Sequence, residues 1–347
     1  MRRIMGWGVV GVCLCGLLVR PLHADDVAKR VKKAVAESTL DQPGTKPFHL
    51  KAALAPSRPR DNGSGRTGTV EIWWKSPTQW RREVTCPIFH QVQVVNGDQL
   101  WQKNDGDYFP DWLRQTATEL IDPVPNLQDV LVQMDTGEVK DMFGSTYIEW
   151  MIPSTDGQVK SWTGAAVALT DSTGLLFYGE GFAWGAIFHD YRKFNRRMVP
   201  MTVGVGDPEV TAKVMTLEDL QETPGLLDAS AAGGDPHPIR TVFLDEPTLR
   251  KNLEPIAPVQ WPPVKDGPLE GAATTEVVVD RQGNVREVTT IVTQNNALID
   301  TVRQYIESMH FRPFLQNGEP AQVVSRITLG FRTVRDGGVE IHPPHSE

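Results

Sequence analysis

The sequence predicts an α+β protein in which a meandering antiparallel sheet, or open β-barrel, precedes a smaller unit of strands and one helix. Short β-branched and aromatic segments recur between turn signals from Phe48 to about Leu220, which favours antiparallel strands. Residues 221–238 are rich in Ala, Gly, Asp and Pro, which indicates a linker. Beyond it, residues 271–332 have the order strand, turn, strand, helix, strand.

The composition is that of a folded protein and narrows the class of partner. Of the 347 residues, 40% are hydrophobic and 22% are charged, which is the balance of a soluble globular protein. Ten Trp and twelve Phe can bury a sizeable core, so disorder along the whole chain is excluded. The net charge of -8 argues against nucleic acid, because phosphate binding draws on Lys and Arg.

Two helices of the first half follow from apolar residues at helical spacing. The N-terminal helix is expected within residues 25–44, where Asp41-Gln-Pro-Gly44 ends the pattern. Its apolar positions are Val27, Val31, Val35 and Leu40. A second helix is expected at about residues 123–135. The residues that share its apolar face are Leu127, Val130, Leu131 and Met134.

The strands of the first half follow from alternation and from turn chemistry. Gln91-Val-Gln-Val-Val95 alternates polar and apolar residues, and Gln99-Leu-Trp101 follows two residues after Asn96-Gly97. Because Asn-Gly readily adopts the positive φ angles of a tight turn, these segments form a predicted hairpin. Further strands are expected at residues 69–74, 146–152, 165–169, 185–188, 199–203 and 210–214.

The first 24 residues have the pattern of a secretory signal peptide. Arg2 and Arg3 precede an uncharged apolar run over residues 4–19, and Ala24 provides a small residue for cleavage. The run is shorter than the roughly 20 residues that a membrane-spanning helix needs. We therefore expect a periplasmic protein, and the alternative is an inner-membrane protein anchored by residues 4–19.

Five segments of the first half share their order with a known family. They are Phe48-His-Leu-Lys-Ala52, Gly68-Thr-Val-Glu-Ile-Trp-Trp-Lys-Ser-Pro77, Trp80-Arg-Arg-Glu83, Val95-Asn-Gly-Asp-Gln-Leu-Trp101 and Asp190-Tyr-Arg-Lys-Phe194. This pattern, over about residues 48–220, resembles the LolA/LolB-like carriers of lipoproteins and lipids in the bacterial envelope. The resemblance implies a half-open antiparallel β-barrel with helices, whose apolar interior takes the acyl chain of a lipid or lipoprotein.

A second set of motifs lies near the C-terminus. It comprises Trp261-Pro-Pro263, Glu270-Gly271, Val277-Val-Val-Asp-Arg-Gln-Gly-Asn-Val285 and Phe311-Arg-Pro-Phe-Leu-Gln-Asn-Gly-Glu-Pro320. Over about residues 255–333 this order resembles the TonB C-terminal domain. The resemblance implies a small α+β domain that binds an outer-membrane or other envelope protein. A membrane-anchored energy transducer is the alternative, although the expected cleavable N-terminus and the lack of a long Pro-rich spacer disfavour it.

The two resemblances give the chain six expected parts. They are a signal peptide (1–24), an N-terminal helix (25–44), a LolA-like half-barrel (45–222), a linker (223–254), a TonB C-terminal-like domain (255–333) and a disordered tail (334–347).

Aromatic residues of the expected half-barrel are the candidates for binding an apolar ligand. Ligand pockets are mostly apolar and concave, and large aromatic side chains suit an acyl chain. The alternative is that the same side chains fill the barrel as an ordinary core. Trp73 and Trp74 must face opposite sides of their strand, so only one of them can face the interior. The candidate set is Trp74, Trp80, Trp101, Phe109, Trp112 and Trp150.

The last predicted strand, residues 322–332, is the candidate for contact with a protein partner. An exposed edge strand can accept an extended segment of another protein by β-augmentation. The alternative is a strand that only completes its own sheet. The candidate residues are Val323, Ser325, Ile327 and Leu329.

The sequence carries no recognised catalytic signature. Gly-x-Ser-x-Gly, His-Glu-x-x-His and phosphate-binding glycine loops are absent from it. Its His residues lack metal-ligand spacing, and Cys86 is the one Cys outside the expected signal peptide. We therefore expect a binding protein that is not an enzyme and has no catalytic residues, metal or cofactor. A hydrolase with an unrecognised site and a structural envelope protein are the remaining alternatives.

Overall fold

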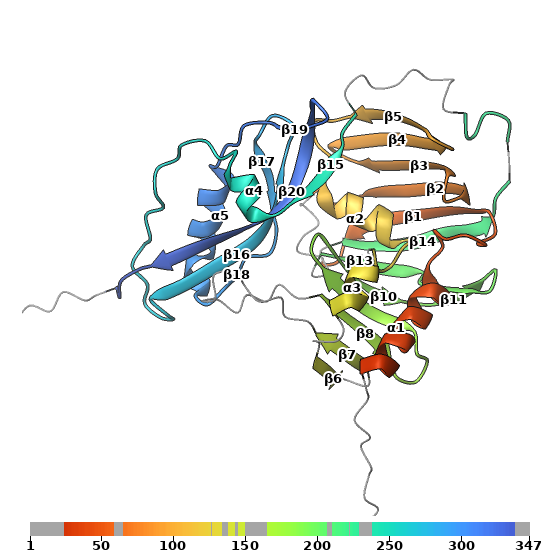
Figure 1. Ribbon diagram of the computed structural model, residues 1–347, viewed down its shortest axis with the longest axis horizontal. Coiled ribbons are helices and arrows are strands. Elements are labelled where there is room, and N and C mark those ends of the chain that lie inside the picture. Colours follow the sequence, from red (N-terminus) through yellow and green to blue (C-terminus); the bar gives the residue numbers. More distant parts are fainter. Residues whose placement is uncertain are drawn as a thin grey trace, which may run out of the picture.

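The computed structural model describes residues 24–58, 65–125, 127–133, 138–142, 145–149, 165–206, 210–221, 223–228 and 238–336. In this part of the chain two sheets form the centres of two units, which Figure 1 shows beside one another. We call residues 24–228 the large domain and residues 238–336 the small domain. Their sheets and few helices confirm the predicted α+β class.

The large domain is built on an antiparallel sheet with twelve described strands in the order β5-β4-β3-β2-β1-β14-β13-β10-β9-β8-β7-β6. The sheet is open, because β5 and β6 are its two ends. Its strands are β1 (Phe48–Pro56), β2 (Gly68–Ser76), β3 (Gln79–Cys86), β4 (Phe89–Asn96), β5 (Gln99–Asp105), β6 (Glu138–Met142), β7 (Ser145–Glu149), β8 (Ala166–Thr170), β9 (Leu176–Gly181), β10 (Trp184–His189), β13 (Thr202–Val205) and β14 (Val210–Asp219). A separate hairpin pairs β11 (Arg192–Phe194) with β12 (Arg197–Val199).

Side chains alternate across the large sheet as expected for a half-buried surface. Along β1, Phe48, Leu50 and Ala52 are fully buried, whereas the residues between them are partly exposed. In β2, Trp74 faces this core and Trp73 faces the other side, where it stacks on His49. The two neighbouring tryptophans thus lie on opposite faces, as their spacing predicts.

Three helices, α1 (Ala24–Ser38), α2 (Asp111–Glu119) and α3 (Leu127–Gln133), lie across one face of the large sheet (Figure 1). Helix α1 forms within the expected range and buries Val27, Val31 and Val35. Helix α3 lies within the second predicted range. Helix α2 was not predicted, because its sequence contains two Thr and only one large aliphatic residue, Leu113.

The small domain has a mixed sheet in the order β15-β20-β16-β17, with β18 paired to β16 and β19 paired to β20. Helix α5 lies against it and buries Val302 and Ile306 in the second core. The elements are β15 (Thr241–Leu244), α4 (Glu246–Arg250), β16 (Glu270–Val279), β17 (Val285–Val288), β18 (Val292–Thr293), η3 (Asn296–Leu298), α5 (Ile299–Glu307), β19 (Phe314–Gln316) and β20 (Glu319–Arg332).

The linker between the two domains is shorter than the range 223–254 predicted from the sequence. Residues 241–250, which lie inside the range 223–254, form β15 and α4. Strand β15 pairs in parallel with β20, and Asp245 caps α4 by accepting a hydrogen bond from the Thr248 backbone N–H at 2.8 Å. The four-residue strand was missed because its short apolar run directly follows a Pro-rich segment.

Strand β20 is not a free edge along most of its length. It pairs with β15 over residues 322–325 and with β16 over residues 323–332. At Thr328 the backbone N–H donates to Glu246 Oε1 at 2.9 Å, and the carbonyl accepts from Arg250 Nη2 at 2.8 Å. The candidate partner-binding side chains are all buried, so they belong to the core in this conformation: Val323, Ser325, Ile327 and Leu329.

The two ends of the chain lie mainly beyond the described residues. Of the expected signal peptide only Ala24 is described, as the first residue of α1. The first residues of the expected tail are ordered, since the Val334 carbonyl accepts from the Val264 backbone N–H at 2.9 Å. In the described ranges, no helix is long and apolar enough to cross a membrane.

Candidate functional site

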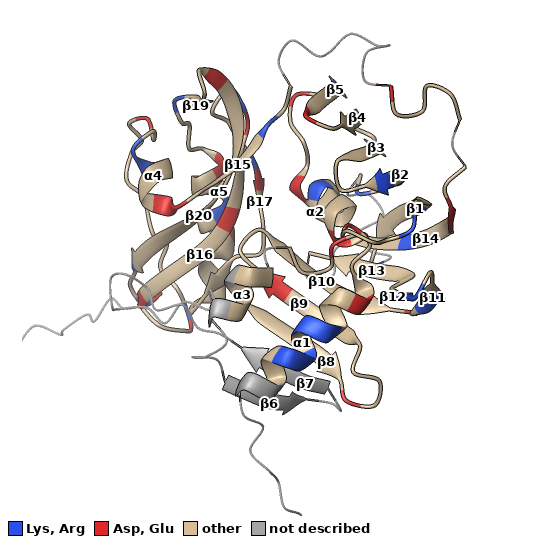
Figure 2. Cartoon of the chain, turned by 45° about the vertical axis from the view of Figure 1, so that its right-hand side comes forward, with Lys and Arg blue, Asp and Glu red and all other residues tan. Residues whose placement is uncertain are grey.

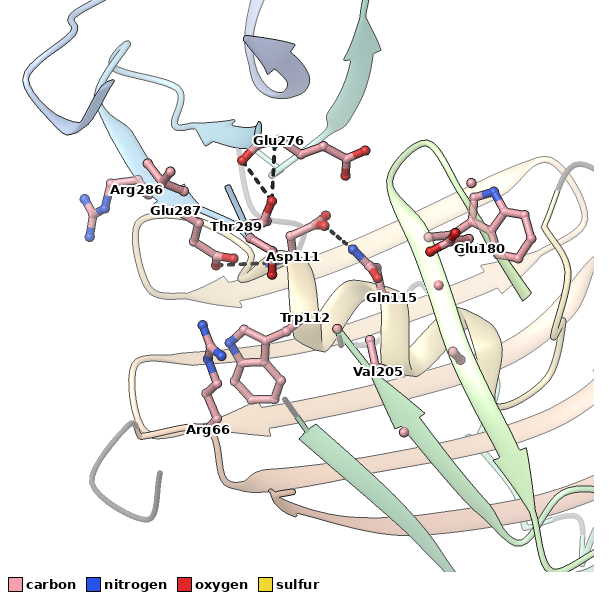
Figure 3. A pocket seen from close by; sticks show the side chains of 18 of the residues that line it. Arg66, Asp111, Trp112, Gln115, Glu180, Val205, Glu276, Arg286, Glu287 and Thr289 are labelled. Carbon is pink, nitrogen blue, oxygen red and sulfur yellow. Dashed lines mark hydrogen bonds between the residues drawn. The ribbon is translucent and has the colours of Figure 1, made fainter. Parts of the chain in front are cut away.

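A cavity of about 640 Å³ lies between the two domains and is the candidate site (Figure 3). We call it the cleft. Its volume is within the range of roughly 300–1,000 Å³ that small-molecule sites occupy. Helix α2 and strands β9, β10 and β13 form the wall from the large domain, and β16, β17 and α5 contribute the wall from the small domain.

The large domain gives the cleft an aromatic and aliphatic wall. Trp112 comes from α2, Trp184 and Ile187 come from β10, and Val205 comes from β13. Trp184 is the register partner of Gly181 in β9. The two glycines of β9 make room for its ring, because a Cβ at Gly181 would lie 2.3 Å from Trp184 Nε1 and a Cβ at Gly179 would lie 2.9 Å from Trp184 Cζ3.

The small domain gives the cleft a charged wall. Glu287 of β17 accepts a hydrogen bond from the Asp111 backbone N–H at 3.1 Å, so the start of α2 is tied directly to the small domain (Figure 3). The buried Asp111 carboxylate accepts from Arg114 Nε at 2.6 Å and from Gln115 Nε2 at 2.5 Å. Glu276 of β16 pairs with Arg326 at 3.0 Å.

Burial dominates the acidity of the cleft carboxyl groups. Desolvation, together with the negative charge of Asp111, raises the pKa of Glu287 from 4.5 to about 7. Burial also raises the pKa of Glu276, although Arg326 opposes this rise. The cleft therefore holds carboxyl groups whose charge a bound cation would stabilise.

A second set of contacts holds the two domains together beside the cleft. The Gln322 side chain donates through Nε2 to the Phe109 carbonyl and accepts through Oε1 from the Phe109 backbone N–H, both at 2.8 Å. Ala183 has a φ angle of 59°, in the left-handed region. Its carbonyl accepts from Arg114 Nη2 at 2.7 Å, and its N–H donates to Glu276 Oε1 at 3.3 Å.

Two of the predicted ligand-binding residues contribute to the core face of the large sheet. Trp74 stacks on Phe48 with ring centroids 5.3 Å apart, and its Nε1 donates to Asp41 Oδ1 at 2.9 Å. Trp80, the register partner of Trp74, is partly buried against this core, and the Arg82 guanidinium lies 5.6 Å from its ring. Neither residue lines the cleft.

Trp101 lies on the other side of the large sheet. The strand register places it opposite Val94, which is opposite Arg81, and Arg81 is opposite Trp73. This row occupies the face turned away from Trp74. Trp101 therefore does not face the same interior as Trp74 and Trp80.

The remaining three candidates have different positions. Phe109 is buried, stacks on Phe89 with centroids 4.9 Å apart, and takes part in the contact with Gln322. Trp112 lines the cleft and also packs against the core of the large domain. Trp150 lies outside the described residues. The structure thus brings one candidate, Trp112, to the cleft.

Sequence reasoning missed the cleft residues Trp184, Glu287 and Asp111. A local signal existed for Trp184, because a Gly-x-Gly segment precedes it at hairpin distance. Glu287 has the pattern of an ordinary polar position of a strand, and Asp111 lies in a segment for which no element was predicted. Their importance arises from the approach of two domains, which no local pattern indicates. In the described ranges, no cluster of His, Cys, Asp and Glu is arranged to hold a metal ion.

Glu119, one turn beyond Gln115 on α2, is expected to make stability depend on pH. It is fully buried, accepts from the Gly185 backbone N–H at 2.9 Å, and burial raises its pKa from 4.5 to about 8. The unfolded chain therefore loses this proton first, and the free energy of unfolding falls as the pH rises from about 4.5 to 8. Glu119→Gln removes the ionisable group and with it this fall in stability. The variant should therefore be more stable than the parent protein at pH 9 by on the order of a few kcal/mol.

Urea unfolding between pH 5 and pH 9 checks this expectation. Glu270→Gln is the matched control, because its side chain is exposed and pairs with Arg332 at the surface. It should follow the parent profile throughout. Parallel profiles for Glu119→Gln and the parent protein would show that Glu119 is not the group responsible.

The open sheet, the small α+β domain and the cleft between them define a two-domain protein with a candidate binding site at the domain junction. Residues 264–333 match the family described as the Gram-negative bacterial TonB protein C-terminal, which confirms the resemblance of this part of the chain. No curated protein matches the sequence.

Solved structures that match this chain include one member of the predicted superfamily. A LolA superfamily protein from Nitrosomonas europaea has 8% identity and a TM-score of 0.34, and the match covers 56% of this chain and 94% of that chain. A DUF1329 family protein from Desulfovibrio piger has 10% identity and a TM-score of 0.35, with 60% and 98% covered. MucB, solved in complex with MucA(peri), has 12% identity and a TM-score of 0.26, with 84% and 100% covered.

Proposed function

We propose that the chain is a non-enzymatic periplasmic envelope protein that binds an apolar ligand and a protein partner. The ligand is the acyl chain of a lipid or lipoprotein, and the small domain contacts the partner. A signal peptide, residues 1–24, directs export and is then removed. The observation that carries the proposal is the cleft of about 640 Å³ with its aromatic wall.

The distribution of apolar side chains supports the cleft as the ligand site. Beneath the helices, the core face of the large sheet is filled by buried residues such as Trp74, Leu113 and Val31. An acyl chain would have to displace this packing. In the cleft, Trp112 and Ile187 are partly exposed and line open volume, so a ligand can bind without that cost.

Exposed apolar side chains of the small domain support a protein partner. Leu315 on the β19–β20 hairpin is 56% exposed, and Phe243 on β15 is 50% exposed. Aromatic and aliphatic anchors are typical of the centre of a protein interface. We therefore propose that these two residues, and not the buried side chains of β20, make the partner contact.

Titration with a fluorescent fatty acid tests the ligand proposal. Binding should enhance the probe fluorescence, and Trp112→Ala should weaken it about tenfold because a large part of the aromatic wall is removed. Trp73→Ala is the matched control, because Trp73 lies on the opposite face of the large sheet and should bind as the parent protein does. Circular dichroism confirms that both variants fold. Equal weakening by the two substitutions would contradict the placement of the ligand.

A further inference from the structure

The charged residues of the cleft carry both signs on one side of its apolar wall. Figure 2 shows acidic and basic segments on α2 and on β17 where the two domains face one another. The acidic lining residues are Asp111, Glu180, Glu276, Glu287 and Glu307. The basic lining residues are Arg66, Arg286 and Arg303. A purely apolar ligand would match only the apolar wall, and a ligand with a single charge would match only one of the two charged sets.

The carboxyl groups suit a primary ammonium group. The Glu287 carboxylate meets the N-terminus of α2 across the cleft, where it accepts from the Asp111 backbone N–H, and the side chain of Tyr108 also hydrogen-bonds Glu287. Negative charge from Asp111 already disfavours ionisation of Glu287. An ammonium group placed beside these two carboxyl groups would donate charge-assisted hydrogen bonds to Glu287 and offset this repulsion.

The guanidinium groups suit a phosphate next to that ammonium. Figure 3 shows Arg66 beside Trp112, and its positive charge opposes the rise that burial causes in the pKa of the nearby Glu287 carboxyl group. Arg286 lies 4.7 Å over the ring of Tyr108, and Arg303 Nη1 donates to the Val288 carbonyl at 2.8 Å. These contacts hold both guanidinium groups at the wall of the cleft, and the planar guanidinium is well matched to phosphate oxygens.

We propose that the cleft binds a phospholipid with a zwitterionic, amine-bearing headgroup. Its ammonium lies at Asp111 and Glu287, its phosphate lies among the arginines, and its acyl chains follow the wall of Trp112 and Trp184. This inference rests on the proposed function and adds the headgroup that the cleft selects.

Three phospholipids with identical short acyl chains test the headgroup. Phosphatidylethanolamine should bind the full chain about tenfold more tightly than phosphatidylglycerol, because only the former carries the ammonium. Phosphatidylcholine should fall below phosphatidylethanolamine, because its quaternary nitrogen has no N–H to donate. Glu287→Gln retains an acceptor for the Asp111 N–H and should abolish the preference, whereas the exposed Glu270→Gln should keep it.

The outcomes separate the inference from the proposed function. Equal affinity for all three lipids, or a preference for phosphatidylglycerol, overturns the headgroup assignment and leaves the acyl-chain proposal standing. Binding of none of them overturns both. The comparison on the parent protein needs no variant, so a folding defect in Glu287→Gln would not obscure it. Retention of the full preference in a folded Glu287→Gln protein also overturns the assignment.

Discussion

Trp74→Ala is expected to lower the free energy of unfolding by about 3–5 kcal/mol, as large-to-small substitution of a buried aromatic residue does. Trp74 is 1% exposed and stacks on Phe48. Its removal leaves a cavity between β2 and the helices and deprives Asp41 of the hydrogen bond from Trp74 Nε1. Urea unfolding measures the change, and binding of the fluorescent fatty acid at low temperature measures whether the cleft survives.

The neighbouring Trp73→Ala is the matched control for this substitution. Trp73 lies on the opposite face, stacked between His49 and the Arg81 guanidinium, and is partly exposed. Its loss should cost about 1 kcal/mol. A small effect of Trp74→Ala on stability combined with loss of ligand binding would instead assign Trp74 to a ligand site, as the sequence suggested.

Gln322→Ala is expected to lower the free energy of unfolding by about 2–4 kcal/mol and to loosen the contact between the domains. Gln322 is fully buried, and its side chain satisfies both the N–H and the carbonyl of Phe109. Alanine leaves both backbone groups buried without this partner. Hydrogen exchange should report faster exchange of the Phe109 amide, and urea unfolding should report the loss of stability.

Gln316→Ala provides the comparison, because Gln316 is an exposed residue of β19 in the same domain. It should change stability by less than about 0.5 kcal/mol. Unchanged protection of the Phe109 amide in Gln322→Ala would contradict the role of Gln322 at the junction.

Structural features that depend on residues close together in the sequence could be predicted from it. The predicted hairpin of β4 and β5 forms at Asn96-Gly97, and Asn96 pairs with Gln99 across the turn. The opposite orientation of Trp73 and Trp74 follows from the period of a strand. The N-terminal helix follows from its apolar spacing. These features need no knowledge of the partner strand or of the other domain.

Features that depend on distant segments were not predictable. Strand β15 is four residues long and forms only because it pairs with β20, about 80 residues later in the chain. The same pairing buries Ser325, whose Oγ donates a hydrogen bond to the Leu244 carbonyl at 2.8 Å. Strand β20, which the sequence suggested as an exposed edge, is therefore an internal strand over these residues. The cleft likewise arises where Asp111 meets Glu287, and neither residue carries a local sign of it.

Native mass spectrometry of the protein purified from a cell-envelope extract tests the central claim, that the cleft holds an acyl-chain ligand. The account predicts adducts of lipid mass on the parent protein that are retained in Trp73→Ala and reduced in Trp112→Ala. A mass without adducts, which stays unchanged after incubation with phospholipid and with lipoprotein, would contradict it.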